Sequence, residues 1–224
     1  MQIVTKCLEI VVLIVCSVPQ GSVLGPRLFV LYTAELADVI HQQELKFHSY
    51  ADDSQLYMHC QRDDIATTAT HLSQCVVDIG HWMAANRLQM NPAKTELLWA
   101  GTKHNVSLLG CHAPTLQLGM DNVTPSNHVR VLGVTISSDL SLDQHVSKVC
   151  AAGFYRLRQL RRIRKSLDKE SAATLVHAFV TSRVDYCNAV YAMSPQTITS
   201  RLQRVLNAAA RVASDTGFLT RCAI

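Results

Sequence analysis

This sequence lacks most of the features that assign a chain quickly to a structural class. Its 224 residues contain no low-complexity tract and no repeat at the periods of solenoid proteins, which excludes fibrous and repeat architectures. No apolar run approaches the roughly 20 residues that a membrane-spanning helix needs. A globular protein with one large domain or two small ones remains.

Cysteines are present but do not follow a disulfide or zinc-binding pattern. The eight are spread along the chain with no C-x-x-C pair, so we expect reduced, mostly buried thiols in an intracellular protein. The adjacent pairs His59–Cys60 and Cys111–His112 have poor geometry for two ligands of one tetrahedral zinc ion. We therefore expect no structural zinc site.

A convincing leader peptide is also missing. The apolar run Ile10–Val15 follows Lys6, but Glu9 and the lack of an A-x-A-like cleavage site argue against a signal peptide. Its β-branched residues favour a buried strand. We therefore expect the protein in the nucleus or cytoplasm, with a secreted or membrane-tethered product as the alternative.

Acidic residues are absent from one stretch that is rich in basic ones. Between Gln144 and Leu167 there are seven Lys or Arg and no Asp or Glu, whereas the rest of the chain has 14 basic and 17 acidic residues. This asymmetry is typical of a chain with a polyanion-binding part. Leu157, Leu160 and Ile163 lie between the basic residues and would pack a helix down, leaving the charges outside. A solvated face, or pairing with acids elsewhere, is the alternative to phosphate contact.

Strand and helix signals mix in the first two thirds of the chain, and helices alone fill the last third, which predicts an α+β fold. We expect an atypical apolar segment over 1–17, a mixed part over 18–143 and a helical part over 144–224. The expected helices are 26–40, 65–83, 145–165, 167–183 and 197–212. The expected strands flank Ala51–Ser54, follow Asn91–Pro92, and cover 128–137 as one strand that turns at Ser138–Asp139. The stripe predicted to pack the second helix into the core is Ile65, Ala69, Leu72, Val76, Ile79 and Met83.

The segment "HSYADDSQLYMHC" places two adjacent carboxylates, Asp52 and Asp53, at the tip of an expected hairpin. Neighbouring aspartates suit Mg²⁺, which takes one or two carboxylates together with substrate phosphates. Two-metal phosphoryl transfer needs at least one more carboxylate from another strand. A polar turn is the alternative, because Asp is common in turns.

Several motifs along this sequence resemble those of a known family. The motifs "SVPQGSVLGPRLF", "HSYADDSQLY", "NRLQMNPAKTELLW", "VRVLGVTISSDLSLDQHV", "FYRLRQLRRIRKSL" and "SRVDYCNAVYAMSP" occur in order. They are similar to the reverse transcriptase of LINE-type, jockey-like non-LTR retrotransposons, an RNA-directed DNA polymerase. The resemblance covers about 18–212 and implies part of a polymerase palm, a small antiparallel sheet with helices on one face, followed by a helical thumb-like region.

The resemblance also implies roles for individual residues. Asp52 and Asp53 would hold Mg²⁺ or Mn²⁺, and Lys94 would neutralise or protonate the departing pyrophosphate; the alternative for Lys94 is a solvated lysine after a turn. Nucleotide and template contacts would come from Pro19, Gln20, Gly21, Tyr50 and Ala51. Leu132–Ser137 would match the hairpin that grips the primer end, with Leu132, Gly133 and Val134 as the primer grip. Nucleic-acid backbone contacts would come from Arg156, Arg158, Arg161, Arg162, Arg164 and Lys165. The implied partners are an RNA template, a DNA primer and deoxynucleoside triphosphates, with no membrane.

The sequence departs from the family in ways that bear on activity. Only 17 residues precede Val18, and Glu9 is the sole acid among them, so the family's upstream aspartate and fingers have no counterpart here. Arg27 stands where the family usually has an apolar residue. We therefore expect a polymerase fragment that is inactive alone. The alternative is a non-catalytic nucleic-acid-binding remnant that uses the basic helix 144–167.

Overall fold

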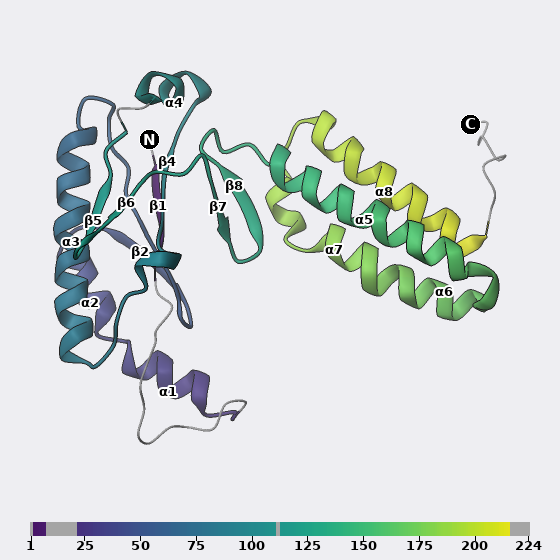
Figure 1. Ribbon diagram of the computed structural model, residues 1–224, viewed down its shortest axis with the longest axis horizontal. Helices are drawn as coiled ribbons and strands as arrows, with labels where there is room; N and C mark the ends of the chain where they lie inside the picture. The colour runs from purple at the N-terminus through teal and green to yellow at the C-terminus, as the bar shows by residue number, and fades with distance from the viewer. Residues whose placement is uncertain (1, 8–21, 111–112, 216–224) are drawn as a thin grey trace. The chain divides into compact units, whose positions relative to one another are not determined.

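A computed structural model of the chain describes residues 2–7, 22–110 and 113–215, and it is α+β as predicted (Figure 1). The chain divides into two compact units. Unit 1 comprises residues 1–131 and 137–140, and unit 2 comprises residues 132–136 and 141–224.

Unit 1 is built on a four-stranded antiparallel sheet in the order β2-β3-β1-β4. These strands are β1 (Gln2–Cys7), β2 (Lys46–Tyr50), β3 (Asp53–Tyr57) and β4 (Glu96–Ala100). The β2–β3 hairpin and β4 are confirmed predictions, whereas β1 is a central strand that the sequence does not predict. The strand expected at Ile10–Val15 lies outside the described residues.

Helix α3 (Ile65–Ala85) covers one face of this sheet, as Figure 1 shows. All six residues of its predicted stripe are buried, so the helical period there is confirmed. The stripe packs with Leu56 of β3 and with Leu97 and Trp99 of β4 into one apolar core. Burial of this face, at about 25 cal/mol per Å² of apolar area, is what holds helix and sheet together.

The single helix expected from Pro26 to Ile40 is two helices, α1 (Gly25–Tyr32) and α2 (Leu36–His41), so that prediction is wrong. α1 buries no side chain, whereas α2 buries Leu36 and Ile40 against the core. The break follows Thr33: its N–H still donates to the Phe29 carbonyl at 3.0 Å, whereas the next N–H, of Ala34, donates to the Leu31 carbonyl at 3.3 Å, three residues back instead of four. The apolar spacing of α1 therefore faces no core of its own.

Several short elements complete unit 1. A 3₁₀ turn η1 (Pro92–Lys94) precedes β4, and Asn91 caps it by accepting the Ala93 N–H at 3.1 Å. Helix α4 (Lys103–Leu109) and the hairpin of β5 (Leu116–Leu118) and β6 (Asp121–Val123) follow, and the sequence predicts none of them. Among the described residues, no helix combines the length and the apolar character needed to cross a bilayer.

The expected single strand over 128–137 is a hairpin, β7 (His128–Val131) and β8 (Val134–Ser137), so that prediction is also wrong. Its turn consists of Leu132 and Gly133, with φ of +45° and +87°. Two positive φ angles in succession are typical of the tightest hairpin turns. The sequence "VLGV" does not predict this turn, because leucine is not a typical turn residue.

Unit 2 consists mainly of helices that lie side by side: α5 (Asp143–Ile163), α6 (Lys169–Val176), α7 (Ser182–Asp185) and α8 (Gln196–Ser214) (Figure 1). A 3₁₀ turn η3 (Arg164–Ser166) ends α5, a π-helical turn η4 (His177–Thr181) joins α6 to α7, and a second 3₁₀ turn η5 (Asn188–Tyr191) follows α7. The helices expected over the three C-terminal ranges are therefore present. Their core includes Leu157, Val180 and Val205, all fully buried.

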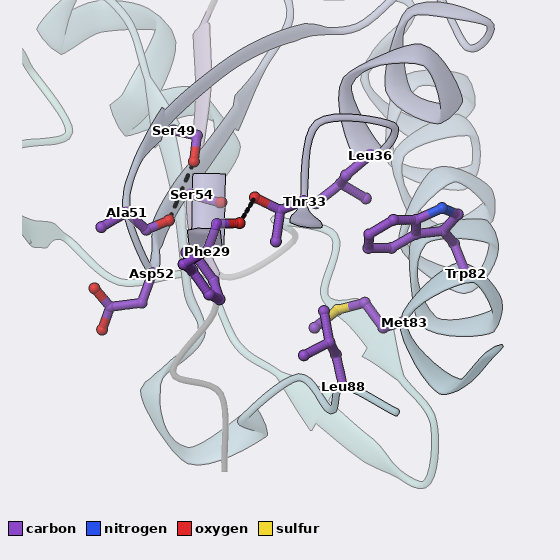
Figure 2. A pocket seen from close by; sticks show the side chains of 10 residues that line it. All are labelled: Phe29, Thr33, Leu36, Ser49, Ala51, Asp52, Ser54, Trp82, Met83 and Leu88. Atoms are coloured by element: carbon purple, nitrogen blue, oxygen red, sulfur yellow. Dashed lines mark hydrogen bonds between the residues drawn. The ribbon is translucent and has the colours of Figure 1, made fainter. Parts of the chain in front are cut away.

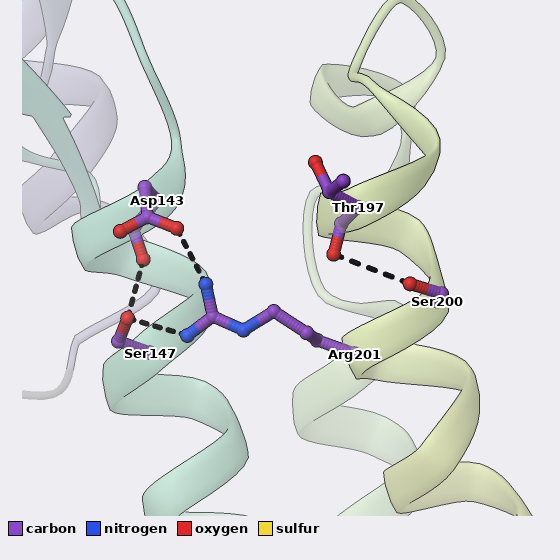
Figure 3. Close-up of polar contacts among 5 residues, drawn as sticks. All are labelled: Asp143, Ser147, Thr197, Ser200 and Arg201. Carbon is purple, nitrogen blue, oxygen red and sulfur yellow. Dashed lines mark hydrogen bonds and ion pairs between the residues drawn. The ribbon is translucent and has the colours of Figure 1, made fainter.

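One polar contact joins α5 to α8 near the start of both helices (Figure 3). Arg201 donates to the Asp143 carboxylate at 2.5 Å and to the Ser147 hydroxyl at 2.6 Å. Ser147 in turn donates to the Asp143 carbonyl at 2.7 Å. This guanidinium therefore fixes the register of α8 against α5 rather than facing solvent freely.

Candidate functional site

The β2–β3 hairpin holds the two aspartates at its tip. Tyr50 and Asp53 form the last strand pair, so Ala51 and Asp52 alone make the turn. Ala51 has φ +56°, a left-handed conformation that costs a residue with a Cβ roughly 1 kcal/mol or more. The Ser49 hydroxyl donates to the Ala51 carbonyl at 3.2 Å and helps to hold this turn. The result is an exposed Asp52 beside a half-buried Asp53.

The two faces of the hairpin differ in chemistry. Ser54 and Leu56 of β3 point into the core and are almost completely buried, at 3% and 2% exposure. The residues that alternate with them, and their strand partners, form an outer face that is polar or aromatic: Lys46, His48, Tyr50, Asp53, Gln55 and Tyr57. On this face the His48 Nε2 and the Tyr57 hydroxyl lie 2.8 Å apart. Asp53 and Tyr50 thus belong to a polar surface that the helices leave uncovered.

A small pocket opens beside the hairpin tip (Figure 2). Figure 2 shows Asp52 at its edge, with the carboxylate turned away from the apolar lining. Phe29 and Leu36 from α1 and α2, and Trp82 and Met83 from α3, supply much of that lining, and the empty space is about 270 Å³, part of it open to solvent. The pocket is therefore lined by α1, α2 and α3 on one side and by the aspartate hairpin on the other. Pro19, Gln20 and Gly21 lie outside the described residues.

Asp52 and Asp53 are the carboxylates at the hairpin tip, and Glu96, the first residue of β4, lies at the same end of the sheet but two strands away from β3. β1 runs beside β3, with Cys7 paired to Ser54, so its carboxyl end lies next to the hairpin tip. The six residues of β1, "QIVTKC", contain no Asp or Glu. Within the described part of the chain, no three His, Cys, Asp or Glu side chains gather as a metal site.

Lys94 lies at the same end of the sheet as the aspartates. The register pairs Lys6 with both Gln55 of β3 and Glu96 of β4, so Asp53 and Lys94 each stand two residues before that level. One strand separates them, which corresponds to two strand spacings or roughly 10 Å of backbone. The Lys94 side chain is exposed. The sheet therefore brings Lys94 and the aspartates to the same end of its strands.

The residues of the predicted primer grip are the turn of the β7–β8 hairpin, Leu132 and Gly133, and the first residue of β8, Val134. Val134 is buried, Leu132 is half-buried and Gly133 is exposed. The Tyr186 hydroxyl donates to the Leu132 carbonyl at 2.7 Å, and its ring lies 3.4 Å from the point where a Gly133 Cβ would stand. Sequence reasoning missed Tyr186, which carries no signal of this contact. Because Val134 is buried, the turn presents to a ligand its backbone, Gly133 and the exposed part of the Leu132 side chain.

The basic residues of α5 are in place for contact with an external polyanion, with one exception. Arg158, Arg161 and Arg162 are exposed and have no hydrogen bond or ion pair to any described residue. Lys165, in η3, is exposed as well. Arg164 differs: its guanidinium donates to the carbonyls of Val212, Leu167 and Ala213 at 2.8, 2.9 and 3.2 Å. It ties the end of α8 to the end of α5, so three of its N–H donors are already used within unit 2.

The positive charge extends beyond the stretch singled out in the sequence. Unit 2 contains 13 Lys or Arg and five Asp or Glu, an excess of eight positive charges, whereas unit 1 contains eight and 12. Helix α8 has no acidic residue at all, and the only acid of α5 is Asp143, which Arg201 neutralises. Arg204 and Arg211 are the residues that sequence reasoning missed. The signal that could have found them is the absence of acids over 196–214.

Comparison with known proteins agrees with these features. The family model described as "Reverse transcriptase (RNA-dependent DNA polymerase)" matches residues 4–136, which is more than half of the chain and includes the aspartate hairpin. The "Probable RNA-directed DNA polymerase from transposon BS" of Drosophila melanogaster is 27% identical over 216 residues, covering 91% of this chain. The chain spans only 23% of that relative's length. No solved structure matches the chain. The chain therefore belongs to the reverse transcriptase family of RNA-dependent DNA polymerases.

Proposed function

We propose that this chain is a part of an RNA-directed DNA polymerase from a LINE-type, jockey-like non-LTR retrotransposon. Unit 1 would be the palm and unit 2 the beginning of the thumb. The observation that carries the proposal is the β2–β3 hairpin, which presents Asp52 and Asp53 at the uncovered end of an antiparallel sheet. The substrates would be an RNA template, a DNA primer and deoxynucleoside triphosphates, inside the cell, in the nucleus or cytoplasm.

The residues at the hairpin tip fit Mg²⁺ or Mn²⁺ by their chemistry. Both ions prefer carboxylate oxygens together with substrate phosphates and water. Asp52 is exposed, so its carboxylate is accessible to an ion that also binds phosphate and water. When bound, such ions stabilise the charge that develops on the transferring phosphoryl group. Asp52 would hold the metal directly and Asp53, half-buried and one residue on, would support it.

Other residues of the chain would position and neutralise the substrates. Lys94, at the same end of the sheet as the aspartates, is suited to neutralise or protonate the departing pyrophosphate. Tyr50 and Ala51 would face the nucleotide and template together with the Pro19–Gly21 loop. The turn of Leu132 and Gly133 would touch the primer end through backbone atoms. Arg156, Arg158, Arg161, Arg162 and Lys165 would contact backbone phosphates, which is sequence-independent and salt-dependent binding.

We propose that these 224 residues do not polymerise by themselves. Catalysis by metal-assisted phosphoryl transfer depends on correctly placed ions, which need a carboxylate that bridges them. The sheet geometry would place that group on the strand beside β3, and the described strand there, β1, has none. A separate or longer polypeptide would have to supply it.

A metal-binding measurement and a primer-extension assay together test this proposal. We expect Mn²⁺ to bind weakly to the purified chain, and Asp52→Asn to abolish that binding. Asp63→Asn, a change at an exposed aspartate of unit 1 away from the hairpin, is the matched control and should leave binding intact. We expect no primer extension with Mg²⁺ or Mn²⁺. Robust incorporation of nucleotides that depends on Asp52 would overturn the proposed inactivity, whereas Mn²⁺ binding that ignores Asp52 would overturn the metal site.

A second candidate is a non-catalytic nucleic-acid-binding protein that uses residues 144–167. The excess of eight positive charges on unit 2 favours it. We expect binding to weaken steeply with salt, and the combined change of Arg158, Arg161 and Arg162 to Gln to lower the log–log salt slope by about 2 units, at roughly 0.7 per lost contact to a single strand. Arg62→Gln, an exposed arginine of unit 1, is the control. An unchanged slope in the triple variant would eliminate this role for α5.

A further inference from the structure

An ordered cluster of aromatic and arginine side chains lies on the surface of unit 2. The Arg156 guanidinium carbon is 5.7 Å from the centre of the Tyr155 ring and 5.9 Å from the centre of the Phe179 ring. Both rings are exposed, Tyr155 at 55% and Phe179 at 46%. What distinguishes these two exposed rings is that both lie beside one guanidinium, which makes a surface site with aromatic faces and positive charge together.

Hydrogen bonds fix this cluster in place. The Gln159 side chain donates to the Tyr155 hydroxyl at 3.0 Å and accepts from an Arg156 terminal nitrogen at 3.0 Å. Arg156 is thereby held between the rings. An arginine that simply solvates the surface would not need a side-chain partner and two ring contacts. The cluster is therefore preorganised, which lowers the entropy cost of binding a ligand.

The backbone under Phe179 supports a binding role. Phe179 lies in the π-helical turn η4, between α6 and α7, and its neighbour Val180 is fully buried against α5. π-Helical turns are rare and occur often at functional sites. Here the turn keeps Val180 in the core while it leaves the Phe179 ring on the surface next to Arg156.

The charges around the cluster indicate a polyanion. Arg158 and Arg162 follow Tyr155 at three and seven residues along α5, which places them on its side of the helix. The segment that contains Phe179 has no acidic residue between Glu170 and Asp185. An arginine row with aromatic rings beside it is the arrangement by which proteins hold single-stranded nucleic acid, with phosphates on the cations and bases on the rings.

We propose that the rings of Tyr155 and Phe179, which together with Arg156 are called here the stacking cluster, bind the bases of a single-stranded polynucleotide while Arg156, Arg158 and Arg162 hold its phosphates. This inference rests on the proposed nucleic-acid binding of unit 2 and goes beyond it, because backbone contact alone does not need bases. Base–ring stacking tolerates any sequence, so the cluster would capture unpaired RNA or DNA without sequence preference.

Fluorescence anisotropy on the full chain tests this inference. The probes are labelled 12-nucleotide strands of uridine and of thymidine, the same DNA length with abasic spacers, and a duplex of equal length. We expect the uridine or the thymidine strand to bind at least about fivefold more tightly than the abasic strand, which corresponds to the low end of the 1–3 kcal/mol per stacked base. The ratio between uridine and thymidine strands tells RNA from DNA as the preferred source. Equal binding of base-containing and abasic strands would overturn the inference and leave the proposed backbone binding intact.

Substitutions separate stacking from charge. Tyr155→Leu and Phe179→Leu should each weaken single-strand binding about fivefold or more and leave the salt slope unchanged, because neither removes a charge. Phe154→Leu is the matched control: Phe154 is a neighbouring exposed ring on α5 that is not in contact with Arg156, and we expect no effect. Arg158→Gln should lower the salt slope by about 0.7 for a single strand and act equally on base-containing and abasic strands.

Other outcomes would contradict the inference in distinguishable ways. If the wild-type chain binds none of the nucleic acids at physiological salt, both this inference and the proposed nucleic-acid binding fail. If polyglutamate competes fully and its own binding depends on Tyr155 and Phe179, the cluster is a docking site for an acidic peptide instead. Because the two rings are exposed, the leucine variants should fold normally, which a far-ultraviolet circular dichroism spectrum identical to wild type would verify.

Discussion

Gly153 lies in the middle of α5 where this helix packs against α8, and its replacement by alanine is expected to destabilise unit 2. A Cβ built there would stand 2.8 Å from Val205 Cγ1 and 3.7 Å from Val180 Cγ1. Ordinary carbon contacts lie at about 3.5–4.0 Å, so the first contact is too short by roughly 1 Å. Both valines are fully buried and have little room to move.

The size of the effect is a balance of two terms. Overpacking of a core by a methyl group costs roughly 1–3 kcal/mol, whereas alanine gains about 1 kcal/mol over glycine in a helix interior. We expect a net loss of about 1 kcal/mol, or roughly 4–8 °C in the melting temperature of a unit of this size. Gly80 in α3 is the matched control, because its added Cβ would meet only the flexible end of Met90, at 3.3 Å. Gly80→Ala should stabilise unit 1 by about 0.5–1 kcal/mol.

The two tryptophans make the assay specific for each unit. Trp82 and Trp99 both belong to unit 1, so tryptophan fluorescence follows unit 1 and far-ultraviolet circular dichroism reports helices of both units. Thermal unfolding of Gly153→Ala should lower the dichroism transition, and that of Gly80→Ala should raise the fluorescence transition. Adding Val205→Ala to Gly153→Ala should show a favourable coupling of about 1 kcal/mol, because it removes the short contact. A Gly153→Ala chain as stable as wild type, or no coupling, would refute the packing argument.

Three further predictions concern unit 2. Gly133→Ala should destabilise the β7–β8 turn by roughly 1–2 kcal/mol, because φ is +87° there and the Tyr186 ring blocks the Cβ; unchanged thermal unfolding would contradict this. Tyr191→Phe should leave the melting temperature unchanged or raise it, because the buried Tyr191 hydroxyl has no hydrogen-bond partner among the described residues; a loss above about 1 kcal/mol would mean that it has one. Hydrogen bonds from Ser171 lower the pKa of Asp168, which caps α6, so its stabilising effect is present above the usual aspartate range and is lost as pH falls below about 4. In an acid titration followed by circular dichroism, Asp168→Asn should lose less helix than wild type, and identical curves would contradict the cap.

The sequence predicts those elements whose pattern is decided by a single buried face. The stripe of α3 packs on a core that needs every fourth or third residue, so its period is strong and correct. The β2–β3 hairpin is also predicted, because runs with strand-forming residues such as Phe47, Tyr50 and Leu56 flank the turn segment Ala51–Ser54. In both elements the local conformational preference and the tertiary packing favour the same residues.

The sequence fails where packing overrides the local pattern. α1 has apolar residues at helical spacing but buries none of them, and the helix ends at Tyr32 although the apolar spacing continues. β1 has only six residues of mixed polar and apolar character, and its pairing with both β3 and β4 is not evident from its sequence. For the site, the aspartates and the arginines of α5 could be named from the sequence, but the engagement of Arg164 with α8 could not, because its partners are backbone carbonyls almost 50 residues away.

The place of β1 in the sheet has a consequence for how the chain folds. Thr5 pairs with Leu56 and with Leu97, contacts that span about 50 and 90 residues. The β2–β3 hairpin can form locally as soon as it is synthesised, but the sheet cannot close until Ala100 is available to pair with Gln2. A chain that stops before β4 would carry the aspartate hairpin with a central strand bonded on one side only. Synthesis from the N-terminus therefore allows the hairpin with Asp52 and Asp53 to form early. The complete four-stranded sheet that holds this hairpin in place forms last.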